Sequence, residues 1–243
     1  MIALFADYSV TDPYVGLMQM AIYQQAPGCK LVDVCHDLPM FNPNASGRLL
    51  QMLVSDLPAG SIILAVVDPG VGTARHALWL EVDGKHYLGP DNGLLARIVN
   101  QGQQISAHII EYDANDVSTS FHGRDVFAPA AAQIELRNAP ASRSMDASML
   151  IGREWPAELA EIIYIDHYGN AMTGINGAQV SASNVFRVNE AEFEFQKTFQ
   201  NKGRDKPFWY VNSIGLIEFA HYRQSVAGIY HFSVGDRVSL VSA

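Results

Sequence analysis

Short runs of apolar residues recur in the first half of the chain. The runs at 2–6, 30–35 and 61–67 have the length of strands, and they are largely continuous rather than alternating. This pattern is typical of strands that are buried on both faces of a sheet. The runs are far shorter than the ~20 residues of a membrane-spanning helix. We therefore expect no membrane segment.

Helices are predicted between and after these strands. The first begins at Asp12, which we expect to be its N-cap, with Pro13 in the first helical position. It ends near Pro27 and Gly28. Further helices are expected at 44–57, 94–100 and 125–137. The alternation of strands and helices predicts an α/β domain with a mostly parallel sheet covered by helices.

The pattern changes near residue 140. Residues 141–158 are rich in turn-forming residues and are interpreted as a linker. Beyond it, short β-like segments are separated by turn residues, and they predict a smaller all-β domain. These segments are 161–166, 184–188, 191–199, 208–211, 215–220, 228–232 and 236–242. The expected organisation is an N-terminal α/β domain at 1–140, a linker at 141–158 and a C-terminal domain at 159–243.

Composition excludes several classes of protein. The chain has 243 residues, of which 49% are apolar and 17% charged, so neither a disordered chain nor a coiled coil is expected. The net charge is −9 and no basic patch is visible, which argues against nucleic-acid binding. The N-terminal residues do not resemble a signal peptide. Cys29 and Cys35 match no metal spacing and are interpreted as reduced thiols of a cytoplasmic protein.

Polar residues gather where the predicted strands end, which is where open α/β sheets bind ligands. Asp7 directly follows the first strand, and Asp12 begins the first helix. The segment 66–75, Val-Val-Asp-Pro-Gly-Val-Gly-Thr-Ala-Arg, carries Asp68 and Arg75 around a turn with two glycines. Those glycines allow close approach of the backbone to a ligand. A hairpin turn with an Asp–Arg ion pair explains the same residues equally well.

Four further segments contain candidate residues. Residues 88–93 form a dense turn ahead of a helix, for which a structural role is favoured. His122 lies beside a glycine and a charged pair at a loop–helix junction, which makes it an acid/base candidate. Residues 166–170 and 212–218 each suit an ordinary β-turn, and their Asn and Ser side chains also suit a heterocycle or a carboxylate.

Six of these segments together resemble the S-adenosyl-L-methionine (SAM) hydrolase (adenosine-forming) family, a relative of the fluorinases and chlorinases. They occur in the family's order, span nearly the whole chain, and are 7–16, 66–75, 89–93, 121–129, 166–170 and 212–218. Two places depart from the family pattern. The usual Thr-Asp-Phe-Gly is here Ala-Asp-Tyr-Ser at 6–9, and Gly-Ser-Ala is here Gln-Ser-Val at 224–226.

The resemblance implies a reaction and an assembly. The reaction is SAM plus water giving adenosine and L-methionine. The assembly is a homotrimer, with sites where one subunit's N-terminal domain meets a neighbour's C-terminal domain. By the same resemblance, Asp68, Arg75 and His122 correspond to the group that handles the attacking water, and Asp68 also contacts the substrate.

Other positions correspond to substrate contacts. Asp7 matches the carboxylate near the ribose hydroxyls, and Asn170 matches an adenine contact. Ser213 and Glu218 match residues that hold the methionine carboxylate and amine. The remaining matches are a backbone contact at His221 and lining by Phe41, Tyr168 and Phe199.

The chemistry itself makes few demands. A sulfonium departs as a neutral thioether, so we expect neither a metal nor an organic cofactor. One water must be placed in line with the ribose 5′ carbon, and a base assists it by roughly 10²–10⁴-fold. Arg75 would hold Asp68 ionised, while Asp12 and Glu218 are placed to face the ammonium group.

Two alternatives stay open. A halide-using relative would replace water with chloride or fluoride, although the carboxylate of Asp68 would repel an anion. A non-catalytic SAM or adenosine sensor would bind tightly without turnover.

Overall fold

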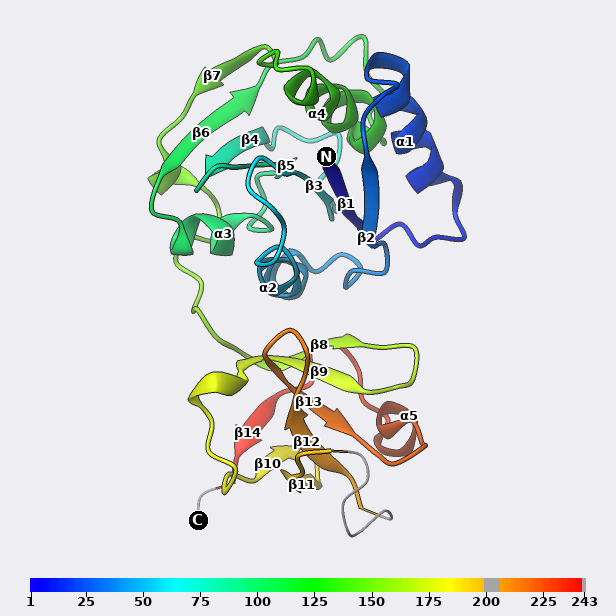
Figure 1. Ribbon diagram of the computed structural model, residues 1–243, viewed down its shortest axis with the longest axis vertical. Helices are drawn as coiled ribbons and strands as arrows, with labels where there is room; N and C mark the ends of the chain where they lie inside the picture. Colours follow the sequence, from blue (N-terminus) through cyan, green and yellow to red (C-terminus); the bar gives the residue numbers. More distant parts are fainter. Residues whose placement is uncertain (199–205, 242–243) are drawn as a thin grey trace. The chain divides into compact units, whose positions relative to one another are not determined.

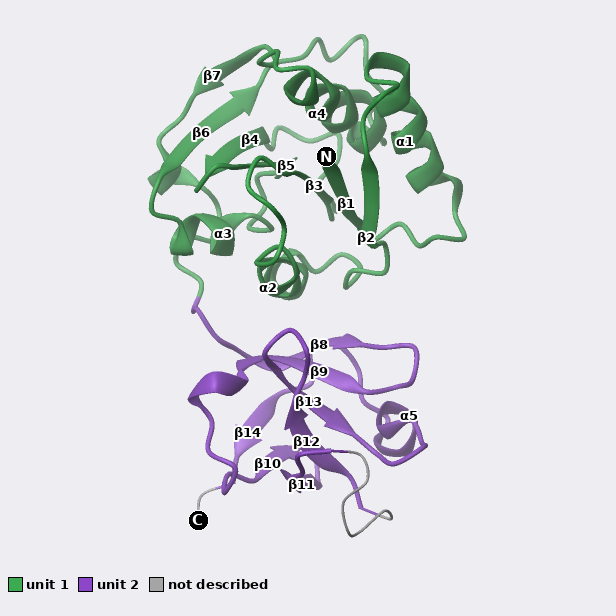
Figure 2. Ribbon diagram, in the orientation of Figure 1, with its two compact units in different colours: residues 1–155 green, residues 156–243 purple. Residues whose placement is uncertain are grey.

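The computed structural model describes residues 1–198 and 206–241. The chain divides into two compact units, Met1–Trp155 and Pro156–Ala243, which are coloured separately in Figure 2. Each unit is built around its own sheet and its own apolar core.

The sheet of the first unit is mixed. In the described residues its strand order is β2-β1-β3-β5-β4-β6-β7. The strands are β1 (Ile2–Ala6), β2 (Leu31–Cys35), β3 (Ile62–Val66), β4 (Ala77–Val82), β5 (Lys85–Pro90), β6 (Ile105–Ile110) and β7 (Ser142–Ser144). The pairs β1–β2, β1–β3 and β3–β5 are parallel, whereas β4–β5, β4–β6 and β6–β7 are antiparallel.

The prediction of a mostly parallel sheet is therefore wrong. Parallel neighbours need a long crossover, usually a helix. Such a helix lies between β1 and β2 and between β2 and β3, but the chain passes from β3 to β4 and from β4 to β5 without one. Residues 83 and 84, an Asp-Gly pair with positive φ angles, make the tight β4–β5 hairpin.

Helices cover both faces of this sheet (Figure 1). One face carries α1 (Pro13–Gln25), a π-helical turn η1 (Gly123–Phe127) and α4 (Ala128–Glu135); the other carries α2 (Pro43–Leu53) and α3 (Ala96–Gln101). The predicted start of α1 is confirmed, although the side chain of Asp12 makes no capping hydrogen bond. Apolar side chains of β1, β3, α1 and α4 form the core of the unit, with Leu4, Met18, Leu64 and Phe127 fully buried.

The connection from β3 to β4 has an unusual path. Because β5 lies between these two strands, residues 67–76 must cross the carboxyl end of β5 to join them. β3 and β5 are parallel and β4 is antiparallel to both, so the end of β3, the end of β5 and the start of β4 share one edge of the sheet. The loop with Asp68 and Arg75 therefore lies next to residues 91–93 at this edge of the sheet.

The second unit is dominated by a sheet with the order β14-β10-β11-β12-β13-β9-β8 within its described part. The strands are β8 (Leu159–Ile165), β9 (Ala171–Asn176), β10 (Phe186–Val188), β11 (Ala191–Phe195), β12 (Phe208–Val211), β13 (Leu216–Ala220) and β14 (Val238–Leu240). Its core includes the aromatic residues Phe186, Phe193, Trp209 and Phe219.

The second unit is not all β. The strand predicted at 228–232 is instead the helix α5 (Val226–Tyr230), shown beside the sheet in Figure 1. The hydroxyl of Ser225 accepts a hydrogen bond from the N–H of Gly228 at 2.9 Å and caps this helix. His231, in the left-handed region at φ 55°, ends it. Short 3-10 turns, η2 (Ala147–Met149) in the first unit and η3 (Gly177–Gln179) in the second, complete the fold.

Neither Cys29 nor Cys35 forms a disulfide. Within the described ranges, no helix has the length and apolar character required to span a bilayer.

Candidate active site

Asp68, Arg75 and His122 lie together although they are distant in the chain. Nε of Arg75 donates to Oδ1 of Asp68 at 2.9 Å, and Nη2 donates to Oδ2 of the same carboxylate. The same Nη2 lies 3.0 Å from Nδ1 of His122. The ionic side chains are almost fully covered, with exposed fractions of 7% for Arg75 and 5% for Asp68. One guanidinium thus joins the carboxylate and the imidazole.

Two separate segments bring this group together. Asp68 and Arg75 lie on the loop that leaves β3, and His122 directly precedes the η1 turn. The guanidinium of Arg75 lies over the Phe127 ring, 5.4 Å from its centre, which supports the cation from the apolar side. The ring of Tyr112 packs edge-on against His122. Burial, and next the positive charge of Arg75, lower the pKa of His122 from its ordinary value.

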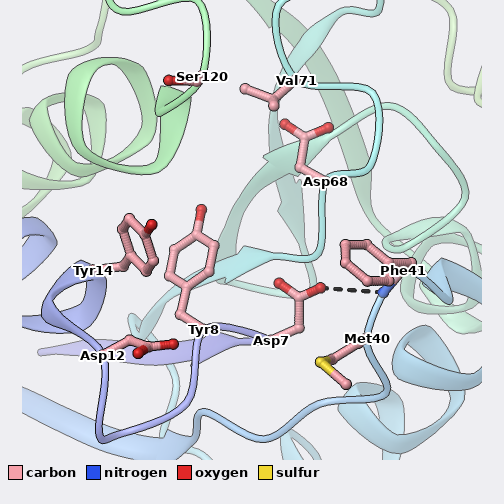
Figure 3. Close-up of a pocket in the computed structure, with 9 residues that line it drawn as sticks. All are labelled: Asp7, Tyr8, Asp12, Tyr14, Met40, Phe41, Asp68, Val71 and Ser120. Carbon is pink, nitrogen blue, oxygen red and sulfur yellow. Dashed lines mark hydrogen bonds between the residues drawn. The ribbon is translucent and has the colours of Figure 1, made fainter.

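An acidic cavity of about 190 Å³ lies beside this group (Figure 3). Its lining comes from the ends of β1 and β3, the start of α1, the loop before α2 and the loop before η1, and comprises Asp7, Tyr8, Asp12, Tyr14, Met40, Phe41, Asp68, Val71 and Ser120. The expected site residues Asp7, Asp12, Phe41 and Asp68 therefore share one cavity. Polar side chains thus converge where β1 and β3 end.

Asp7 is held inside this cavity by the backbone. Its Oδ2 accepts a hydrogen bond from the N–H of Phe41 at 3.2 Å, drawn as a dashed line in Figure 3. Burial raises the pKa of Asp7, and the nearby charge of Asp68 adds to that effect. Phe41 as a whole residue is 74% exposed, and its backbone is left-handed at φ 57°. Apolar surface next to two carboxylates suits a ligand that is both aromatic and cationic.

Apart from Phe41, the sequence did not single out the aromatic side chains at the cavity. The rings of Tyr8, Tyr14 and Phe121 contact one another, with centres 5.3–5.7 Å apart. The sequence did contain one signal for these rings: Tyr8 directly follows Asp7, and Tyr14 lies two residues after Asp12. Burial raises the pKa of Tyr8, which keeps the phenol protonated.

The turn between β8 and β9 in the second unit is built around Asp166. Its Oδ1 accepts from the backbone N–H groups of Tyr168 and Asn170 at 2.9 and 2.8 Å. Its Oδ2 accepts from Nδ2 of Asn170 at 3.0 Å, which fixes the amide of this expected adenine contact. Tyr168 is 77% exposed and Asn170 is buried. Asp166 was not among the expected site residues, yet it orients one of them.

A second turn, between β12 and β13, depends on Asn212. Its Oδ1 accepts from the N–H groups of Ile214 and Leu216 at 3.2 and 3.0 Å, and its Nδ2 donates to Oε2 of Glu218 at 2.8 Å. The other oxygen of Glu218 accepts from the hydroxyl of Tyr210. Glu218 is only 2% exposed, and burial raises its pKa. The exposed Ser213 lies on this turn, so Glu218 supports it through Asn212.

The expected contacts of the second unit lie along β13 rather than at one point. Leu216 pairs with Asn176 and Phe219 with Ala171, so the two turns lie toward opposite ends of β13. Asn170 and His221 are near its carboxyl end, and Ser213 precedes its start. His221 is buried. Phe199 lies outside the described residues.

Across 1–198 and 206–241, no cluster of three or more His, Cys, Asp or Glu side chains is arranged to ligate a metal ion.

Taken together, the mixed sheet with a polar site at its edge and the sheet-rich second unit define a class of two-domain α/β proteins. Two family models match the chain: the SAM hydroxide adenosyltransferase N-terminal domain over residues 2–143 and its C-terminal domain over 160–239. The chain therefore belongs to the SAM hydroxide adenosyltransferase family.

Individual relatives agree with this assignment. The chain is 32% identical to the (R)-S-adenosyl-L-methionine hydrolase of Thermus thermophilus, over 97% of each protein. A fluorinase of Actinoplanes is more distant, with 21% identity over 100% of this chain and 97% of the relative. A crystal structure of an uncharacterized conserved protein from Thermotoga maritima matches with a TM-score of 0.87 and 25% identity, over 99% of this chain and 100% of that one.

Proposed function

We propose that this protein hydrolyses SAM to adenosine and L-methionine. The observation that carries the proposal is the Asp68–Arg75–His122 group at the wall of an acidic cavity. Membership of the SAM hydroxide adenosyltransferase family and the similarity to a named SAM hydrolase support it.

The reaction is a direct displacement. The oxygen of one water attacks the 5′ carbon of the ribose, a C–O bond forms, and the C–S bond breaks with its electron pair leaving on sulfur. Methionine departs as a neutral thioether, so the leaving group needs no proton. The attacking water loses one proton, which passes to the enzyme and then to solvent. Good alignment of the water with the 5′ carbon lowers the barrier by up to ~7–11 kcal/mol.

Asp68 is the proposed acceptor of that proton. Each carboxylate oxygen has two lone pairs, and the described hydrogen bonds from Arg75 use one on each. The remaining lone pairs can orient and then deprotonate a water. Arg75 fixes the carboxylate in place, and His122 fixes Arg75 from the other side.

Charge favours a cationic substrate and water over a halide. The cavity is lined by three carboxylates, those of Asp7, Asp12 and Asp68. They attract the sulfonium and ammonium groups of SAM, and they repel chloride or fluoride. We therefore favour hydrolysis over the halogenation implied by the name of the fluorinase relative.

The remaining substrate contacts are proposals from the family resemblance. Asp7 would contact the ribose hydroxyls, Asn170 the adenine and Ser213 the methionine carboxylate, with Glu218 acting on that end through Asn212. His221, Phe41 and Tyr168 would complete the lining.

Trimerisation with shared sites and a cytoplasmic location also stay predictions. The cavity of about 190 Å³ is below the roughly 300–1,000 Å³ of typical small-molecule sites, which supports completion by a second surface.

Incubation with SAM in ¹⁸O-labelled water tests the proposal. Label at the 5′ oxygen of adenosine, together with release of methionine, is the expected result, and Asp68→Asn should abolish both. Both sulfur epimers are supplied, because the similar relative is named for the (R) form. Parallel reactions contain chloride or fluoride at high concentration. A 5′-halogenated nucleoside would establish the alternative chemistry, and binding without turnover would establish a sensor.

A further inference from the structure

The turn at residues 89–93 holds both ends of the loop that carries Asp68 and Arg75. At the start of the loop, the carbonyl of Val67 accepts a hydrogen bond from Nδ2 of Asn92 at 2.8 Å. At its end, the carbonyl of His76 accepts from the backbone N–H of Asp91 at 3.0 Å. Two consecutive residues therefore fasten the two points between which the loop crosses the sheet edge.

The strand order explains why these residues meet. The loop joins β3 to β4 across the end of β5, and Asp91 and Asn92 are the residues that directly follow β5. Gly89 within β5 lies close to the carbonyl of Ala65, where an added Cβ would clash. The end of β5 is thus packed tightly against the end of β3, and it forms a fixed base below the loop.

An amide side chain suits position 92 for a specific reason. Its nitrogen donates to Val67, while its oxygen accepts from the N–H of Leu94 at 3.2 Å. A carboxylate has the same shape, but it accepts only. Val67 is fully buried, so its carbonyl would lose a hydrogen bond that water cannot easily replace.

The second anchor, the His76 carbonyl, also contacts Arg75 of the Asp68–Arg75–His122 group. Nη1 of Arg75 donates to the same His76 carbonyl, at 3.4 Å, that accepts from Asp91. The carboxylate of Asp91 is buried and accepts from the N–H of Ile151 at 3.1 Å, which holds the turn from below. A displacement of this turn is therefore transmitted to Asp68 through Val67 and to Arg75 through His76.

We infer that Asn92 is a positioning residue for the reaction: its amide sets the placement of Asp68, and of the Arg75 side chain paired with it, by anchoring the Val67 carbonyl directly before Asp68. This inference rests on the proposed function, since placement matters for the attack on SAM. A misplacement of about 1 Å can cost ~10²-fold in rate even when a mutation lies away from the chemistry.

The test compares Asn92→Asp with Asn100→Asp. Asn100 also donates its Nδ2 to a backbone carbonyl, that of Arg153 at 3.2 Å, but this contact is exposed and involves no residue of 67–76. We expect Asn92→Asp to lower kcat by about 10–100-fold while the Kd for adenosine changes by less than about threefold. Asn100→Asp should keep kcat within about twofold. An equal loss in both variants, or an unchanged kcat in Asn92→Asp, overturns the inference.

Hydrogen exchange separates this inference from the proposed function. In Asn92→Asp, backbone amides at 67–76 should exchange faster than in the parent protein, and those in β12 and β13 should not change. This readout needs no activity, so it decides the anchoring role even if the parent protein does not hydrolyse SAM; unchanged exchange at 67–76 overturns it. If Asn92→Asp does not fold, Asn92→Ser replaces it, because a serine hydroxyl can still accept from Leu94 but is too short to reach Val67.

Discussion

Nη2 of Arg75 lies 3.0 Å from Nδ1 of His122, and this contact determines which tautomer the histidine adopts. A guanidinium has donors and no acceptor, so Nδ1 must accept, and the neutral ring carries its hydrogen on Nε2. In this form Nε2 of His122 is a hydrogen-bond donor rather than a base. Asp68, which also receives hydrogen bonds from Arg75, is left as the acceptor of the three.

Replacing Arg75 by lysine should show whether catalysis needs only the positive charge of Arg75 or also the planar shape of its guanidinium. A lysine ammonium carries the same charge, but it cannot present the planar fork that here contacts both Asp68 and His122. We expect kcat for SAM hydrolysis to fall by about 10²-fold or more, with a smaller change in KM. Steady-state kinetics with circular dichroism as the folding control would measure this. A kcat within about threefold of the parent value would mean that charge alone suffices.

The pH dependence of kcat/KM should follow the state of His122. Its pKa is lowered from the ordinary 6.5, first by burial and then by Arg75. Neutral Nδ1 is the form that accepts from Arg75, and protonation breaks this contact. The activity should therefore persist at pH 6.5 and decline only below it.

His122→Gln provides the control for this pH profile. Its amide oxygen can accept from Arg75 and does not titrate, so the decline attributed to the imidazole should disappear from a profile measured between about pH 4.5 and 8.5. If kcat/KM declines at low pH in the same way in both proteins, a group other than His122 causes the decline.

Asp7→Asn should weaken substrate binding more than catalysis. The amide oxygen can still accept from the N–H of Phe41, but the negative charge that faces a cationic ligand is removed. Hydrogen bonds to charged groups contribute about 1.5–3 kcal/mol, so KM for SAM should rise by roughly 10–100-fold. Asp33→Asn, which makes the same change of charge outside the cavity, should leave KM unchanged. Equal effects of the two variants would contradict a local role for Asp7.

Glu218→Gln should stabilise the protein at neutral pH. Burial raises the pKa of Glu218, so the folded state binds its proton more tightly than the unfolded chain. The free energy of unfolding therefore falls as pH rises through the folded-state pKa, and the ionised carboxylate costs stability above it. A neutral glutamine avoids this cost and can keep contacts with Tyr210 and Asn212.

We expect Tm of Glu218→Gln to exceed that of the parent by about 2–4 °C at pH 7.5, which corresponds to a gain of ~1 kcal/mol in a protein of this size. The difference should shrink toward pH 5. Thermal unfolding at several pH values measures it, and a lower Tm at every pH would show that the carboxylate itself is required for the fold.

The sequence predicted strands well where burial is complete. The runs at 2–6 and 61–67 became β1 and β3, fully buried on both faces. β4, β5 and β6 were missed because they mix apolar residues with Glu81, His86 and His108, which interrupts the pattern. The Asp83-Gly84 pair was an overlooked hairpin signal, and recognising it would have predicted the antiparallel half of the sheet.

The candidate site was predictable only in part. The loop motif and the His-Gly-Arg-Asp segment made Asp68, Arg75 and His122 candidates. The local pattern fitted a hairpin turn with an ion pair equally well, and the family resemblance supplied the roles of the three residues. The burial of Glu218 was not predictable, because it depends on Tyr210 lying directly opposite it in the neighbouring strand. The anchoring by Asn92 depends on the order of β3, β5 and β4, which local patterns do not contain.

The two anchors of the reactive loop have one more consequence. Both are backbone carbonyls, at Val67 and His76, and a carbonyl is present whatever side chain occupies the position. The residues between these two carbonyls could therefore be replaced together, which would alter the nucleophile that the enzyme accepts. The hydrogen bonds from Asn92 and Asp91 would still hold both ends of the loop.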